Sequence, residues 1–178
     1  SWKGHKKGVQ CLASNSKASV IAVGGSNIKL LDTGSDAKKK KLEGHFSGGV
    51  AAQAFSTCGC YLACAGIASR EVLVYDVRAS AKADPIHVLA VKDSVSSLSV
   101  RSTDGCIDVM CCYAGAQAGG CYMRTSSNAK TQTVQITGEV IAISHQHEEV
   151  RLAVGSAIKP TVHTIDATDL EQKTINVQ

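Results

Sequence analysis

The fold is decided by GHKKGVQCLASNSKASVIAVGGSNIKLLD, residues 4–32, and by GHFSGGVAAQAFSTCGCYLACAGIASREVLVYD, residues 44–76. Each stretch opens with a Gly-His pair, followed by an apolar segment, a turn of small polar residues and a second apolar segment. A glycine-containing turn then leads into a third apolar segment that ends in aspartate. The Gly-His pair recurs forty residues later, so the chain contains a repeat.

The period and the marker residues identify the repeat unit. A period of about 40 to 45 residues, with a Gly-His opening and a closing pair that ends in aspartate, is typical of a WD-repeat blade, one four-stranded sheet of a β-propeller. The closing pairs are Leu31-Asp32 and Tyr75-Asp76, and neither contains the usual tryptophan.

Beyond residue 80 the Gly-His pair is absent, but short strands and turns continue at the same spacing. SVSSLSV, IDVMCCYA, GGCYMR and TQTVQI form one set of four, and EVIAISHQ, RLAVGS, TVHTIDA and KTINVQ form the next. No segment has helical periodicity. We therefore predict an all-β chain of about four blades, and we expect it to be part of a larger ring because propellers commonly have up to eight. The blades are expected at about residues 4–44, 45–92, 93–137 and 138–178.

Four residues at the marker positions are predicted to be structural: His5, Asp32, His45 and Asp76. In a WD blade the histidine, a serine or threonine, a turn aspartate and the tryptophan form a buried hydrogen-bonded chain that holds the blade in one geometry. The tryptophan and the turn aspartate are missing here. We therefore expect these blades to depend on apolar packing between neighbouring sheets.

Composition narrows the class of protein. The chain has 178 residues, of which 44% are apolar and 19% charged, as in a soluble globular domain. No apolar run approaches the roughly 20 residues of a membrane helix, so no membrane partner is expected. The eight cysteines lie in apolar runs such as CYLAC and VMCCYA, which favours reduced, buried thiols in an intracellular protein over a disulfide framework.

Two sets of residues suggest a metal site, and a structural role explains each better. Cys58, Cys60 and Cys64 lack the second pair of ligands that a zinc site usually has. Cys60 and Cys64 are instead expected on one face of a strand, in the core. The pair His145 and His147 lies at a polar strand end and is expected to form a solvated turn.

Catalytic motifs are equally weak. The segment AGAQAGG, residues 114–120, lacks the Lys-Ser/Thr ending of a phosphate-binding loop, and a hairpin connection is expected there. Ser47 in GHFSGG has the wrong spacing for a nucleophile elbow. We therefore predict no catalytic residue, no metal, no cofactor and no enzymatic activity.

The strongest charged feature is the run Lys38, Lys39, Lys40 and Lys41, in a chain of formal net charge +4. We place it between the third strand of the first blade and its outer strand. There it could form a solvated edge that discourages pairing between sheets. Alternatively, it could contact RNA phosphates by charge without recognising sequence.

The order of these features resembles one family. Gly-His blades with degenerate closing pairs come first, a blade without Gly-His opens near VKDSVSSLSV, and the fourth blade has Gly155-Ser156 followed by Pro160-Thr161-Val162. This order resembles the WD-repeat subunit of the UTP-A (t-UTP) subcomplex, the U three protein five family, over nearly the whole chain. Pro160 is expected just before the third strand of its blade, where its missing N–H costs little.

The resemblance implies a non-catalytic scaffold of the small-subunit processome, located in the nucleolus and acting in early pre-ribosomal RNA processing and transcription. It implies other UTP-A subunits and processome proteins as partners. The 5′ external transcribed spacer and the U three small nucleolar ribonucleoprotein would be contacted indirectly or through the RNA backbone. The alternative is a generic WD-repeat adaptor, such as a ubiquitin-ligase substrate receptor or a trafficking-coat subunit. A propeller hydrolase would need a metal or carboxylate cluster in the central channel, which the sequence does not offer.

Overall fold

The structure, a computed structural model, describes most of the chain. The backbone is described for residues 8–15, 17, 19–34, 38–44, 46, 48–79, 82–103, 105–113, 119–126, 129–137, 139–146, 149–155, 161–166 and 172–176. Side chains are described up to Thr125, except those of Lys38, Lys39 and Lys82. Every regular element in these residues is a β-strand, and no described helix is long and apolar enough to cross a membrane.

The first sheet is formed by the first repeat. Its apolar segments pair as antiparallel neighbours in chain order, with registers such as Ala13 opposite Ala22 and Ala22 opposite Leu30. The four strands are β1 (Cys11–Asn15), β2 (Val20–Gly24), β3 (Ile28–Asp32) and β4 (Lys38–Leu42).

The second sheet is formed by the second repeat and one later strand, while the short strand between them joins the first sheet. Its strands are β5 (Val50–Phe55), β6 (Tyr61–Gly66), β7 (Glu71–Asp76) and β9 (His87–Ala90). The short strand β8 (Lys82–Ala83) leaves this sheet and pairs in parallel with β4 of the first. The connection after β7 thereby joins two blades.

The third and fourth sheets are regular four-stranded meanders in chain order. The third contains β10 (Val95–Thr103), β11 (Cys106–Tyr113), β12 (Gly119–Ser126) and β13 (Ala129–Thr137). The fourth contains β14 (Glu139–Gln146), β15 (Glu149–Gly155), β16 (Thr161–Asp166) and β17 (Gln172–Asn176). Strand β16 begins at Thr161, and Pro160, which is expected just before this strand, lies outside the described residues.

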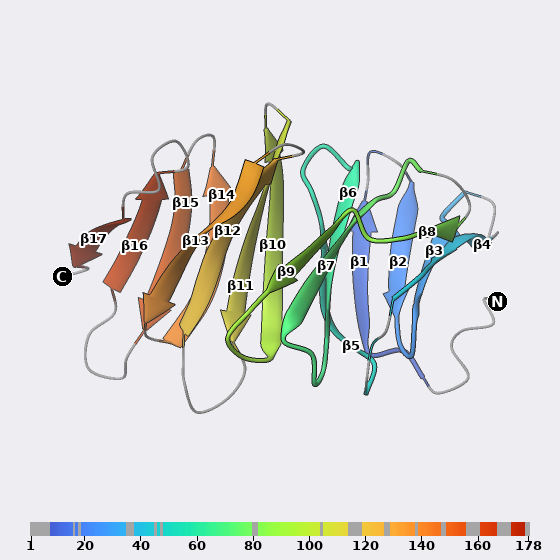
Figure 1. Ribbon diagram of the computed structural model, residues 1–178, viewed down its shortest axis with the longest axis horizontal. Helices are drawn as coiled ribbons and strands as arrows, with labels where there is room; N and C mark the ends of the chain where they lie inside the picture. The colour runs from blue at the N-terminus through green and yellow to red at the C-terminus, as the bar shows by residue number, and fades with distance from the viewer. Residues whose placement is uncertain are drawn as a thin grey trace.

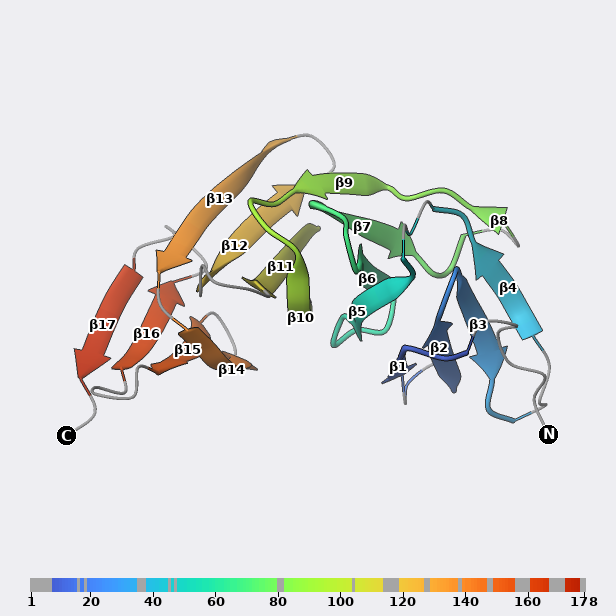
Figure 2. The same cartoon turned by 90° about the horizontal axis from the view of Figure 1, so that it is seen from below.

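The four sheets stand side by side in an open arc (Figures 1 and 2). The first strand of each sheet, namely β1, β5, β10 and β14, lies on the concave side of the arc, and β4, β9, β13 and β17 lie on the convex side (Figure 2). This arrangement confirms the predicted all-β fold, a partial β-propeller of about four blades.

The described core lies between sheets, as expected for blades that lack the buried polar network. One cluster joins the first and second sheets and includes Ile28, Leu42, Leu62 and Tyr75, each 2% exposed or less. A second cluster joins the second and third sheets and includes Val72, Val109 and Met123. Burying such side chains contributes about 1.5–3 kcal/mol each, so contact between adjacent blades is a main source of stability.

Two expectations about local structure are wrong. The four lysines do not precede the outer strand of the first blade: they form it, because pairing with β3 and burial of Leu42 outweigh the low β-propensity of lysine. Cys60 does not share a strand with Cys64. Strand β6 begins at Tyr61, and Cys60 lies in the preceding turn, where Gly59 has a φ of 79°.

Candidate functional site

The sheets have two ends that carry different loops. At the connection end, one blade leads into the next through residues 43–49 and 91–94, and the β2–β3 and β6–β7 turns also lie there. At the opposite end, here called the hairpin end, lie the β1–β2 and β5–β6 turns. Because loops can vary without disturbing the sheets, such ends are where a rigid scaffold carries binding residues.

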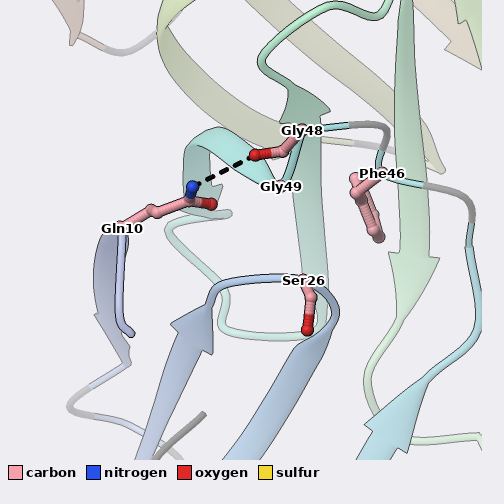
Figure 3. Close-up of a pocket in the computed structure, with 5 residues that line it drawn as sticks. All are labelled: Gln10, Ser26, Phe46, Gly48 and Gly49. Carbon is pink, nitrogen blue, oxygen red and sulfur yellow. Dashed lines mark hydrogen bonds between the residues drawn. The ribbon is translucent and has the colours of Figure 1, made fainter. Parts of the chain in front are cut away.

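A pocket of about 330 Å³ opens at the connection end, between the first two blades. Figure 3 shows that its residues come from three segments: the approach to β1, the β2–β3 turn and the connection into β5. They are Gln10, Ser26, Phe46, Gly48 and Gly49. The pocket combines the apolar ring of Phe46 with backbone and side-chain polar groups, a mixture that is typical of binding pockets.

Hydrogen bonds link the segments that line the pocket. Gln10 donates from Nε2 to the carbonyl of Gly48 at 3.1 Å (Figure 3), and Val50 N donates to Gly25 O at 2.9 Å. Gly49 has a φ of 105°, and a Cβ there would overlap the Gln10 amide. Glycine is therefore required at this close approach between the two blades.

The closing pair of the second repeat supports the same connection. Tyr75 occupies the position of the usual tryptophan, and its hydroxyl donates to Glu43 O at 2.6 Å, directly before the Gly44-His45 pair. Burial raises the pKa of Tyr75, so the hydroxyl remains a donor. A Cβ on Gly44 would lie 2.5 Å from the Tyr75 hydroxyl and 2.9 Å from Phe46, which explains the glycine of the repeat marker.

A glutamine joins the same two blades on the concave side. Gln53, in β5, donates from Nε2 to Ala22 O at 2.6 Å and to Cys11 O at 3.2 Å. Cys11 returns a weaker contact, from its thiol to Val50 O at 3.5 Å. Burial raises the pKa of Cys11 to about 11, so this cysteine is a neutral packing residue.

The structure places lysines of the Lys38–Lys41 run in different environments. Lys40 is only 8% exposed, and its ammonium donates to Val77 O at 2.6 Å and to Ala79 O at 2.9 Å. The charged group of Lys40 is therefore bonded to the chain that follows β7 of the second blade. Burial lowers the pKa of Lys40, and the charge of Asp76 acts in the opposite direction. Lys41 is partly exposed beside Glu43, with Nζ and Oε1 3.6 Å apart. The side chains of Lys38 and Lys39 lie outside the described residues.

The predicted marker residues are only partly described. His5 and His45 lie outside the described residues. Asp32 ends β3 and accepts a hydrogen bond from Gly34 N at 2.8 Å. Asp76 ends β7 and binds the Arg78 guanidinium, with Oδ2 and an NH2 group 2.7 Å apart. The hydrogen bond from Arg78 is the main reason that the pKa of Asp76 lies below its usual value.

The third sheet carries a row of charges that no local sequence pattern indicates. Arg101, Asp108 and Arg124 lie opposite one another on β10, β11 and β12. Asp108 is fully buried and accepts from Arg101 Nε at 3.1 Å and NH2 at 2.9 Å. Its other oxygen lies 3.1 Å from Arg124 Nε, an ion pair without hydrogen-bond geometry. Alternation along the strands puts this row on the face opposite Val100 and Val109.

Among the described residues, the cysteines do not form a joint metal site. All eight are free thiols, and Cys64, Cys111, Cys112 and Cys121 are buried. Among the residues that the structure describes, no group of three or more His, Cys, Asp or Glu side chains is placed to hold a metal ion. Cys58 and Cys60 lie in the β5–β6 turn at the hairpin end, apart from Cys64 in the core.

One family model matches part of the chain. It is described as "WD domain, G-beta repeat" and matches residues 37–76, from the outer strand of the first blade to the closing pair of the second. No curated protein sequence matches the chain significantly.

Solved structures match almost the whole chain at low sequence identity. The β-propeller domain of Cps50 (Swd1) from Myceliophteria thermophila has a TM-score of 0.72 and 16% identity, over 99% of this chain and 56% of that one. A chain from the crystal structure of the mitotic checkpoint complex has a TM-score of 0.70 and 19% identity, over 98% and 53%. Kuenenia stuttgartiensis hydrazine synthase has a TM-score of 0.65 and 14% identity, over 97% and 51%.

These likenesses concern the fold, and the chain spans about half the length of the chains it matches. Together with the matched repeat they support a WD-repeat protein. A WD-repeat propeller in turn suggests a scaffold for protein interactions.

Proposed function

We propose that this chain is a non-catalytic scaffold that binds partner proteins through the connection end of its blades. The observation that supports this most directly is the pocket between the first two blades, built from three loops and lined by Phe46 and the backbone of Gly48 and Gly49. A rigid arc of sheets with such loops offers fixed docking surfaces without a catalytic group.

We further propose the pathway: small ribosomal subunit assembly, as a nucleolar component of the small-subunit processome together with UTP-A subunits. The support is the co-linear resemblance in sequence, including Gly155-Ser156 and Pro160-Thr161-Val162. The competing proposal is an adaptor in another pathway, such as a ubiquitin-ligase receptor or a trafficking coat. Because both proposals use the same fold, only the identity of the bound partners distinguishes them.

The pathway is tested by affinity purification of the tagged protein from cells, followed by measurement of associated RNA and protein. Enrichment of U three small nucleolar RNA with other processome subunits supports ribosome assembly. Recovery of ligase or coat subunits without that RNA would overturn the pathway and leave the scaffold role intact.

Contact with RNA is a separate proposal and involves fewer lysines than the sequence suggests. Because Lys40 is bonded to two carbonyls, the candidates are Lys38, Lys39 and Lys41. Replacing these three by alanine should weaken binding to spacer RNA. The slope of log affinity against log salt should become shallower by about 0.7–0.9 for each phosphate that is no longer neutralised. Unchanged affinity across a salt titration would remove the proposal, and the matched control is Lys17→Ala at the hairpin end, where Lys17 is exposed.

A further inference from the structure

Packing does not account for one pair of cysteines. Cys58, Gly59 and Cys60 form the β5–β6 turn, and both thiols are partly exposed. Residues two apart have Cα atoms no more than about 7 Å from each other even in an extended chain. The positive φ of Gly59, 79°, bends the chain further at this point. The two cysteines are therefore within the Cα separation that a disulfide bridge spans.

Hydrogen-bond donors converge on one of the two sulfurs. Ser56 Oγ lies 3.2 Å from Cys58 Sγ, and it accepts from Tyr61 N at 3.1 Å, which leaves its own proton to donate to the sulfur. Cys60 N also donates to Cys58 Sγ, at 3.4 Å. Ser102, on β10, also acts to lower the pKa of Cys58. Burial alone would raise the pKa of Cys58, but these hydrogen bonds outweigh it and the pKa lies below its usual value.

The pKa of the second thiol, Cys60, is shifted in the opposite direction. Burial raises the pKa of Cys60, and so does its proximity to Cys58. Two charges act on Cys60 in opposite directions: Arg78, on the β7–β8 connection, lowers its pKa, and Asp76, the last residue of β7, raises it. The Cys60 thiol donates to Cys58 O at 3.8 Å. The turn thus holds one thiol of lowered pKa beside one of raised pKa.

We propose that Cys58 and Cys60 form a redox-sensitive dithiol that hydroperoxides oxidise to a disulfide. The Cys58 thiolate attacks one oxygen of hydrogen peroxide, the O–O bond breaks, and the hydroxide that leaves takes a proton to become water. Cys58 becomes a sulfenic acid. The Cys60 sulfur then loses its proton and attacks Cys58, which forms the S–S bond and expels a second water. Two thiols and one peroxide give one disulfide and two waters.

The turn contacts the first and third blades, so a change in its shape on oxidation would reach both. Gly59 O accepts a buried hydrogen bond of 2.7 Å from Asn15 Nδ2 in the first blade. Ser56 bridges to Val100 in the third blade. Closing the disulfide ring reshapes the turn where three blades meet. This inference does not depend on the proposed scaffold function, because it concerns the hairpin end and a chemical modification.

The test is limited hydrogen peroxide treatment of the folded chain, followed by alkylation and mass spectrometry of the peptide that contains residues 58–60. Wild-type protein should lose two hydrogens and two alkylation sites in this peptide. Cys60→Ser should stop at a sulfenic acid that dimedone traps on Cys58, and Cys58→Ser should leave Cys60 reduced. Cys11→Ser is the control, and its peptide of residues 58–60 should react at the wild-type rate, because Cys11 is a partly exposed thiol of raised pKa.

The role of the donors is tested by rate. Ser56→Ala should slow oxidation about threefold, because removing this donor raises the pKa of Cys58, and the greater nucleophilicity of the thiolate only partly offsets the loss of thiolate. Ser102→Ala removes a donor from outside the turn and should act in the same direction even if Ser56→Ala perturbs folding. Ser69→Ala removes a hydroxyl from the β6–β7 turn and should have no effect. The proposal is overturned if Cys58 and Cys60 oxidise no faster than Cys11, or if both donor variants react at the wild-type rate.

Discussion

At the scale of the residue, the packing around Gly44 explains why this marker glycine is present although the hydrogen-bonded network of a WD blade lacks its tryptophan and turn aspartate. The Tyr75 hydroxyl and side-chain carbons of Leu73 and Phe46 would all lie within 3 Å of a Cβ at this position. The packing of its own blade therefore requires glycine at this position, independently of the role of His45.

Gly44→Ala should lower the free energy of unfolding by about 1–3 kcal/mol, because three buried neighbours must move. Gly34→Ala is the matched control. The nearest atom to its new Cβ is an Asp32 carboxylate oxygen at 3.4 Å, so a change within about 0.5 kcal/mol is expected. Urea unfolding of both variants measures the difference, and equal effects would contradict this account of the marker.

Asp76 gives the fold a dependence on acid. Its pKa in the folded chain lies below the ordinary value of 3.8, mainly because of the hydrogen bond from Arg78. A carboxylate with a depressed folded pKa stabilises the fold above its unfolded pKa, and this contribution is lost as the pH falls through the folded value. Asp76→Asn should therefore reduce the loss of stability between about pH 5 and pH 2.

The measurement is urea unfolding across that pH range. Arg78→Gln should reduce the acid dependence to a similar extent, and the double variant should add little to either single one, because both changes remove one interaction. An Asp76→Asn variant with the acid dependence of the wild type would show that the pair contributes nothing.

At the scale of the element, the outer strand β4 is held by its buried end. Leu42 is fully buried between the first two sheets, whereas Leu12 on β1 is 64% exposed. Leu42→Ala should cost about 2–5 kcal/mol because it leaves a cavity between blades. Leu12→Ala should cost less than about 0.5 kcal/mol. If thermal or urea unfolding gave similar losses for the two variants, packing between the sheets would not be the source of stability.

Most strands could be predicted from the sequence because their apolar runs and glycine turns recur at one period. Strand β4 was missed because four lysines resemble a solvated connection, and only pairing with β3 and burial of Leu42 make them a strand. Strand β8 has two residues and carries no local signal. Its position follows from its pairing with another blade.

The candidate site was less predictable than the fold. Gln10, Ser26 and Phe46 are far apart in the sequence and meet only because two blades pack together. Gln53, which joins the same two blades, does carry a sequence signal, because it is an amide among the small apolar residues of VAAQAF. The charged row on the third sheet has the same origin, since Arg101 and Asp108 become neighbours through strand register.

At the scale of the whole molecule, the two ends of the arc have different chemistry. The connection end carries the pocket and exposed Ile67, 45% accessible, beside Gly48. The hairpin end carries the paired cysteines. We therefore expect partner binding and redox sensitivity to be separable by mutation, with each set of variants leaving the other property unchanged.

The most direct test of the account is whether filling the pocket removes the partners. Ser26→Trp places an indole at the pocket from an exposed turn, and Thr57→Trp places the same group on the exposed β5–β6 turn at the hairpin end as a control. The account predicts that affinity purification with Ser26→Trp loses the co-purifying subunits and U three small nucleolar RNA, while Thr57→Trp retains them. Full recovery of the same components with a folded Ser26→Trp variant would contradict it.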